Sequence, residues 1–174
     1  DQIRTIVQTF RDKALPEIFP GRDWVPKTLI FAKDDSHAED IVKIVREEFG
    51  KGNDFAQKIP YRTTGAKPED LIAAFRTIER PFVMHCKSGA DRAGFASAIY
   101  LMVIAGRPVS EARKMLGLRF LHVKRSRTGV LDYILDLFEA RHAQTGIGFE
   151  EWVQTEYDNA QVQADFEATF KPWF

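Results

Sequence analysis

The region from residue 82 to residue 105 constrains the fold of this chain more than any other. It begins with a short apolar run of β-forming residues, 82–85, and ends with a long and mostly apolar stretch, 92–105, which precedes Gly106. The run has the length and composition of a buried strand, and the stretch has those of a helix that a glycine terminates. Residues 86–91 therefore form a short connection between a strand and a helix.

The same pattern of a strand followed by a helix occurs twice before this region, and helices alone follow it. Short runs rich in β-formers predict strands at residues 27–32, 55–61 and 82–85. Periodic stretches with caps or stops predict helices at residues 37–49, 68–79, 92–105, 110–116, 128–142 and 148–157, with Ser110 as the cap of the fourth. This order predicts an α/β fold in three layers, in which helices cover both faces of a short, mainly parallel sheet and the C-terminal third is helical.

The length of the chain predicts one domain. At 174 residues the chain is long enough to bury a single apolar core, so we expect one α/β domain over residues 1–174. Within it, the segment 1–80 has the order β-α-β-α, and the segment 81–174 contains the last strand, the connection and the remaining helices. Parallel sheets bind ligands at the carboxyl ends of their strands, and residue 86 follows such an end.

The charge and the cysteine content exclude several classes of protein. The 25 basic residues balance 25 acidic ones, which argues against binding of a long polyanion through bulk positive charge, so we expect no nucleic acid partner. The one cysteine, Cys86, cannot form an internal disulfide, which suits a reducing compartment. No apolar run approaches the roughly 20 residues that span a bilayer, so no membrane span is expected. We expect a cytoplasmic protein, and because the sequence begins at Asp1 and not at Met, a removed leading segment stays open as an alternative.

The connection after the strand has the composition of a phosphate-binding loop. The N–H groups of a loop that turns into a helix N-terminus, with the helix dipole behind them, favour a phosphate dianion. Five residues separate Cys86 from Arg92, a spacing at which the guanidinium can hold phosphate oxygens while the sulfur lies beneath phosphorus. The same dipole and Arg92 favour the thiolate, the nucleophilic form of cysteine. The residues expected to bind the phosphate are Lys87, Ser88, Gly89, Ala90, Asp91 and Arg92.

The pattern of His85 and Cys86, five residues and then Arg92 resembles the signature of the protein tyrosine and dual-specificity phosphatase superfamily. The resemblance covers about residues 81–174, where the chain is similar to bacterial members. Further similar runs are Ser126 to Asp132, Trp152-Val153 and Glu156 to Asp158. The resemblance implies that Cys86 is a nucleophile that forms a phosphocysteine intermediate, that Arg92 is the phosphate clamp, and that no metal or other cofactor is needed.

The superfamily also uses an aspartic acid that protonates the leaving oxygen, commonly on a loop upstream of the cysteine. The corresponding loop of this chain, Arg62 to Gly65, contains no Asp. Asp54 precedes the second predicted strand and Asp70 is expected as a charge at a helix start, so the expected acid is Asp91, as in members whose loop has Asp before Arg. Ala93 stands where most members have Ser or Thr, which implies slow hydrolysis of the intermediate.

The substrate class stays open between a phosphorylated protein, on tyrosine, serine or threonine, and a small phosphorylated substrate such as a lipid or sugar. A group of basic residues favours a multiply phosphorylated or acidic substrate, although a solvated surface explains the same residues equally well. The group consists of Lys87, Lys124, Arg125 and Arg127. Three histidines outside the loop lack the spacing of metal ligands, so no zinc site is expected. They are His37, His122 and His142.

Residues 3–77 resemble a different family, the second RecA-like lobe of type I restriction enzyme R subunits. The similar runs are Lys27 to Asp40 and Tyr61 to Gly65. A translocase also needs a Gly-x-x-x-x-Gly-Lys-Ser/Thr loop, and Gly50-Lys51-Gly52 has the wrong spacing for one. The two resemblances together predict a mosaic chain. Two alternatives to an active phosphatase stay open, a catalytically weak or dead phosphate-binding pseudophosphatase and a DNA-binding fragment of a helicase lobe, which the balanced charge disfavours.

Overall fold

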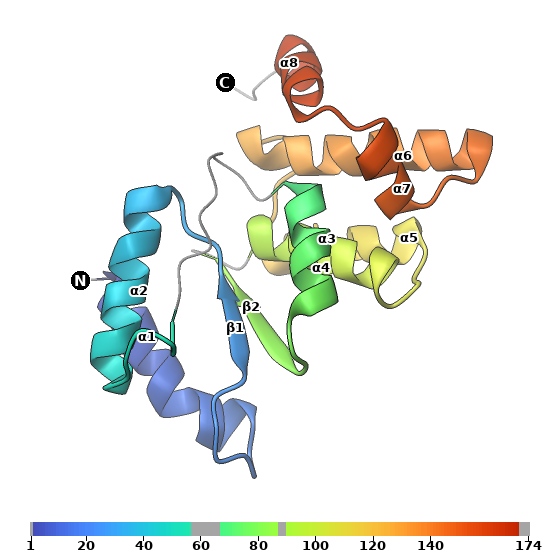
Figure 1. The fold of residues 1–174 in the computed structure, drawn as a ribbon. Helices are drawn as coiled ribbons and strands as arrows, with labels where there is room; N and C mark the ends of the chain where they lie inside the picture. Colours follow the sequence, from blue (N-terminus) through green and yellow to red (C-terminus); the bar gives the residue numbers. More distant parts are fainter. Residues whose placement is uncertain (1, 57–66, 87–89, 171–174) are drawn as a thin grey trace. The chain divides into compact units, whose positions relative to one another are not determined.

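The structure is a computed structural model that describes residues 2–56, 67–86 and 90–170 (Figure 1). It divides into two compact units. The first unit consists of residues 1–65 and 79–83, and the second consists of residues 66–78 and 84–174. Within the described ranges, no helix combines the length and the apolar character needed to cross a membrane.

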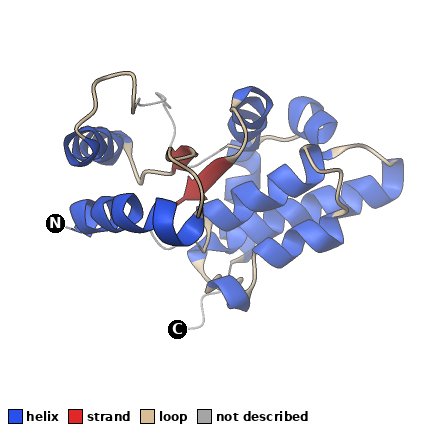
Figure 2. Cartoon of the chain, turned by 90° about the horizontal axis from the view of Figure 1, so that it is seen from below, coloured by secondary structure: helices blue, strands red, loops and turns tan. Residues whose placement is uncertain are grey.

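A short parallel sheet is formed by β1 (Lys27–Ile30) and β2 (Phe82–His85), the two strands of the described residues (Figure 2). Both strands contain the aliphatic, aromatic or β-branched residues that favour a pleated, half-buried surface. The division between the two units passes through β2. The expected α/β class with a short parallel sheet is therefore confirmed, and β1 is two residues shorter than the predicted strand 27–32.

Helix α2 (Asp35–Phe49) of the first unit ends where the sequence predicts and begins two residues before the predicted start at residue 37. The carboxylate of Asp34 accepts a hydrogen bond of 2.9 Å from the backbone N–H of His37, a donor that has no partner inside the helix. Gly50 ends the helix with φ 59°, in the left-handed region that glycine adopts at no steric cost.

Helix α1 (Gln2–Lys13) packs against α2 and was not predicted from the sequence. It continues into a π-helical turn, η1 (Ala14–Ile18). Arg4 of α1 pairs with Glu47 at 2.5 Å and also with Glu48. The exposed pair with Glu47 contributes about 0–1 kcal/mol, which is less than the burial of an aliphatic side chain such as that of Val7 or Ile44.

The second unit is built from helices joined by short turns (Figure 2). Its α-helices are α3 (Pro68–Thr77), α4 (Arg92–Val103), α5 (Val109–Ala112), α6 (Val130–Thr145), α7 (Phe149–Thr155) and α8 (Asn159–Thr169). Its 3₁₀ turns are η2 (Arg113–Met115), η3 (Leu118–Phe120) and η4 (Arg127–Gly129). The predicted helical C-terminal third is confirmed, and α8 extends it beyond the last predicted helix.

Helix α4 forms the middle of the core of the second unit. It contacts α3, α5 and α7, which explains why its sequence is apolar around most of its circumference. Phe95 and Ile99 are almost fully buried, as is Phe75 of α3. The ring of Phe75 meets the ring of Tyr100 edge to face with 5.4 Å between centroids, an arrangement that aromatic quadrupoles favour.

A cluster of aromatic rings holds α7 on α6. The centroid of Phe138 lies 5.0 Å from that of Phe149 and 5.7 Å from that of Trp152. All three side chains are buried. Because α7 also contacts α4, these rings extend the core that α4 forms.

The predicted start of the helix at Ser110 is wrong. Pro108 precedes the first turn of α5, and its carbonyl accepts hydrogen bonds from the N–H groups of Glu111 and Ala112 at 3.0 and 3.1 Å. Proline fixes φ close to the helical value, so the turn closes on this carbonyl and Ser110 lies inside the helix. The predicted helix also changes to a 3₁₀ turn at Arg113.

The remaining fold predictions fall partly outside the described residues. Of the predicted strand 55–61, Phe55 and Ala56 lie in a turn, and residues 57–61 are outside the described residues. The three-layer arrangement and the single domain over residues 1–174 stay predictions.

Candidate active site

Cys86 directly follows β2, at the carboxyl end of the strand, and its side chain is buried, with 3% exposed. The chain resumes with Ala90, also buried, and then with Asp91 and Arg92 at the start of α4. The predicted connection between a strand and a helix is therefore present. Lys87, Ser88 and Gly89 lie outside the described residues, and the opposition of the sulfur and the guanidinium stays a prediction.

Asp91 occupies the N-cap position of α4, yet its side chain caps no N–H group of the helix. Its Oδ1 instead accepts a hydrogen bond of 3.0 Å from the hydroxyl of Thr128 and lies 2.7 Å from Nδ1 of His122. An aspartate at this position usually accepts a hydrogen bond from the second or third N–H of the helix. The carboxylate of Asp91 is thus directed away from the helix backbone and into a side-chain network.

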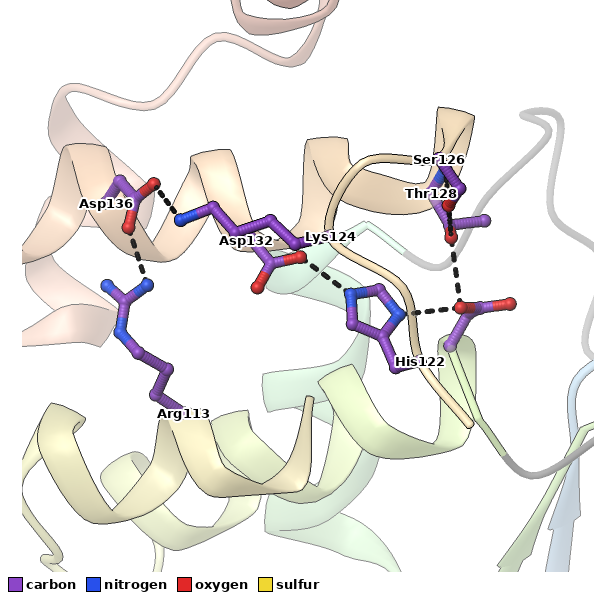
Figure 3. Close-up of polar contacts among 8 residues, drawn as sticks. Arg113, His122, Lys124, Ser126, Thr128, Asp132 and Asp136 are labelled. Carbon is purple, nitrogen blue, oxygen red and sulfur yellow. Dashed lines mark hydrogen bonds and ion pairs between the residues drawn. The ribbon is translucent and has the colours of Figure 1, made fainter. Parts of the chain in front are cut away.

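His122 is the centre of this network (Figure 3). The residue is 2% exposed, and its Nε2 lies 2.6 Å from Oδ2 of Asp132, a buried carboxylate on α6. Burial lowers the pKa of His122, but the hydrogen bonds to Asp132 and Asp91 and their negative charges outweigh burial, so the net pKa is raised above its ordinary value. The ring is therefore held between two carboxylates in a region of the molecule that water does not reach.

The segment between η3 and α6 places these groups through tight backbone contacts. A side chain at Gly129 would bring its Cβ within 2.0 Å of the carbonyl oxygen of Lys124, so only glycine fits where the segment closes on itself. Ser126 caps η4 by accepting the N–H of Thr128 at 3.2 Å, and their hydroxyls lie 2.7 Å apart. The next helical turn carries Asp132 toward the ring.

A model described as the tyrosine phosphatase family matches residues 11–111, more than half of the 174 residues, and the matched range contains Cys86, Asp91 and Arg92. The chain belongs to the tyrosine phosphatase family. No curated protein and no solved structure gives a significant match. The matched range also contains residues 11–77, most of the segment that resembles the restriction enzyme lobe. It ends before His122 and Asp132.

The other aspartates considered as the acid of this phosphatase lie elsewhere. Asp54 is exposed in a turn of the first unit, and Asp70 lies in the first turn of α3, as expected for a charge at a helix start. The loop from Arg62 to Gly65 lies outside the described residues. Asp91 is thus the one of the three that the structure places beside Arg92.

His85 precedes the cysteine and is half-buried, and burial lowers its pKa below the ordinary value. A lowered pKa means that the ring is neutral at pH 7. It therefore adds no positive charge next to Cys86.

The basic residues expected to attract an acidic substrate are partly engaged. Lys124 pairs with Asp136 at 2.9 Å, and the same carboxylate pairs with Arg113 at 2.5 Å (Figure 3). This pairing neutralises some of the positive charge that the sequence presents. Arg127 lies in η4, one residue before Thr128.

Among the described residues, no group of three His, Cys, Asp or Glu side chains has the arrangement of a metal site. Asp91, His122 and Asp132 do not form one, because each ring nitrogen faces a carboxylate oxygen at hydrogen-bond distance. The position of His122 in the sequence allowed it to be judged only as a metal ligand, so its hydrogen bond to Asp91 was not predicted. The resemblance over Ser126 to Asp132 was the one signal that pointed to this segment.

Proposed function

We propose that this member of the tyrosine phosphatase family hydrolyses phosphomonoesters with Cys86 as its nucleophile. The observation that carries the proposal is a buried cysteine at the end of a strand, with Asp91 at the N-cap and Arg92 as the first residue of the next helix, α4. The proposed substrates are phosphotyrosine, phosphoserine or phosphothreonine in a protein, or a phosphorylated lipid or sugar.

In the first step, the thiolate of Cys86 attacks phosphorus and the bond between phosphorus and the leaving oxygen breaks. Asp91 gives its carboxyl proton to that oxygen, while Arg92 neutralises the charge on the other phosphate oxygens. The first-turn N–H groups of α4 assist Arg92 in stabilising the phosphate charge, because the side chain of Asp91 does not cap them. The products of the step are a free alcohol or phenol and a phosphocysteine.

In the second step, water attacks the phosphorus of the phosphocysteine and the bond between sulfur and phosphorus breaks. The carboxylate of Asp91 takes a proton from this water, which restores the acid, and inorganic phosphate leaves. The thiolate of Cys86 is thereby regenerated.

A single-turnover time course with an aryl phosphate tests the proposal. The unsubstituted protein should release aryl alcohol in a Cys86-dependent reaction, and Cys86→Ser should release none. Asp91→Asn should lower the rate on the order of 10²- to 10⁴-fold, the range that general acids contribute. Asp70→Asn is the matched control and should keep the rate, because Asp70 lies in the first turn of α3. The absence of Cys86-dependent release would refute the proposal.

A weak or inactive phosphate-binding protein is the second candidate, and Ala93 favours it. Ala93 is the second residue of α4 and is buried, and it has no hydroxyl to help the thiolate leave in the second step. In that case an initial burst should be followed by very slow turnover, and Ala93→Ser should speed the slow phase. Binding of phosphate without any burst would make the chain a binding protein only.

A further inference from the structure

The network around His122 has a definite direction of hydrogen-bond donation. The hydroxyl of Thr128 donates to Oδ1 of Asp91, so its oxygen is left to accept the hydroxyl of Ser126. Oδ1 of Asp91 is thus an acceptor, and on the other side of the ring Nε2 of His122 lies 2.6 Å from Oδ2 of Asp132. An oxygen atom without a proton can only accept, so both nitrogens of His122 donate when Asp91 carries its proton on Oδ2 and Asp132 is ionised, and the ring is then an imidazolium.

The burial of the three groups differs in a way that fits this reading. The side chains of His122 and Asp132 are 1% and 5% exposed, whereas that of Asp91 is 31% exposed. An imidazolium in such surroundings needs a charged partner, and Asp132 provides one that water cannot replace. Asp91 is the only member of the three that reaches solvent, and therefore a substrate.

We propose that His122 is a positioning residue for the proton transfer of Asp91 and that Asp132 holds its ring in place. This proposal rests on the proposed phosphatase function. His122 donates through Nδ1 to Oδ1 and so leaves Oδ2 of Asp91 as the atom that exchanges protons with the substrate. The proton moves from Oδ2 to the leaving oxygen in the first step and returns from water to Oδ2 in the second, and His122 keeps both of its protons throughout.

The arrangement explains how Asp91 carries a negative charge after the first step. The imidazolium and the hydroxyl of Thr128 both donate to Oδ1, and they stabilise the carboxylate that remains when the proton has left. The charged groups that face the ring are Asp91 from the head of α4 and Asp132 from α6. Loss of the proton on Nδ1 would place two lone pairs against one another, so activity should fall as the pH rises through the titration of His122.

Two substitutions at residue 122 separate the two hydrogen bonds of the ring. An asparagine amide can replace the donor Nδ1 toward Asp91, and a glutamine amide can replace the donor Nε2 toward Asp132. We expect His122→Asn to lower kcat about tenfold and His122→Gln to lower it on the order of 10²-fold, which is the lower end of the range that general acid catalysis contributes. His142→Asn is the control, because this exposed histidine contacts the carbonyl of Ile147 and should leave kcat unchanged.

The pH profile distinguishes positioning from a structural role. Asp132→Asn keeps an acceptor oxygen and removes the charge that helps to hold the ring proton, so the alkaline fall of kcat should move to lower pH. A purely structural residue would lower kcat without moving this fall. The proposal would be overturned if His122→Asn and His122→Gln lost kcat equally and the alkaline fall of kcat in Asp132→Asn stayed at the pH of the unsubstituted protein.

Nitrogen NMR of the histidine rings tests the pairing without any turnover. Both nitrogens of His122 should carry protons at pH 7, and Asp132→Asn and Asp91→Asn should each make the ring lose a proton at lower pH. A neutral ring at pH 7 would overturn the proposal even in an active enzyme. An unsubstituted protein without Cys86-dependent turnover would instead refute the proposed function. The titration of the His122 ring would then test only its hydrogen bonds to Asp91 and Asp132.

Discussion

Removal of the ring of His122 while both carboxylates remain should strongly destabilise the second unit. His122→Leu leaves Asp132 without its partner, and that side chain is 5% exposed, so water cannot replace the lost hydrogen bond. Breaking a buried pair in this way costs about 3–5 kcal/mol of unfolding free energy. Asp91 adds little to the cost, because its side chain is 31% exposed and keeps the hydroxyl of Thr128.

The double variant His122→Leu/Asp132→Leu removes the unpaired charge as well. Replacing both members of a buried pair by apolar residues of similar size is close to neutral, so the double variant should recover most of the loss. The control is Lys124→Met, which breaks an exposed ion pair with Asp136 and should cost less than about 1 kcal/mol.

Urea unfolding followed by tryptophan fluorescence at pH 7 and pH 5 measures these differences. The loss in His122→Leu should depend on pH, because the variant lacks the titrating ring that pairs with Asp132 in the unsubstituted protein. A double variant that is no more stable than His122→Leu would refute the reasoning. A loss that does not depend on pH would do the same.

Three further predictions concern other regions of the fold. Gly129→Ala should cost about 1–3 kcal/mol by overpacking, since its Cβ would lie 2.0 Å from the carbonyl of Lys124, whereas Gly148→Ser has open space and should leave the urea midpoint nearly unchanged. The pKa of His122 is raised in the folded state, so the ring contributes its full stabilisation below the unfolded-state pKa and loses it as the pH rises through the folded-state pKa. The unfolding free energy of His122→Gln should therefore depend less on pH than that of the unsubstituted protein. Asp34→Ala should remove about 0.5–2 kcal/mol with the cap of α2, measurable as earlier loss of helical circular dichroism on heating.

The sequence predicted the elements around Cys86 well because they depend on local signals. A short β-forming run, a glycine-containing connection and an apolar stretch with a terminal glycine each act within a few residues, and β2 and α4 lie where these signals place them. The end of α2 was predicted for the same reason, while its start lies two residues before the predicted one. Helix α1 was missed because most of its stability comes from packing against α2, which is distant in the sequence.

The network behind the loop was not predictable from local patterns. Asp91 and His122 are 31 residues apart, and only the fold brings them to 2.7 Å. A lone histidine between apolar neighbours carries no periodic or spacing signal. His122 could be tested only against the spacing of metal ligands, which it does not match. Nothing in the sequence indicated that Asp132 pairs with a histidine, because an aspartate in the first turn of a helix is common for electrostatic reasons alone.

The segment from η3 to α6 combines strict and permissive positions within a few residues. Leu118 and Leu121 are 77% and 80% exposed, whereas His122 is buried and Gly129 has no room for a side chain. Substitutions at the two leucines remove no buried contact, although the φ of 63° at Leu121 disfavours β-branched replacements there. Substitutions at the other two positions disturb either the charge or the backbone. Relatives of this chain can therefore differ at Leu118 and Leu121 and still retain His122 and Gly129. Sequence identity over the segment from η3 to α6 will then underestimate how closely the relatives agree in function.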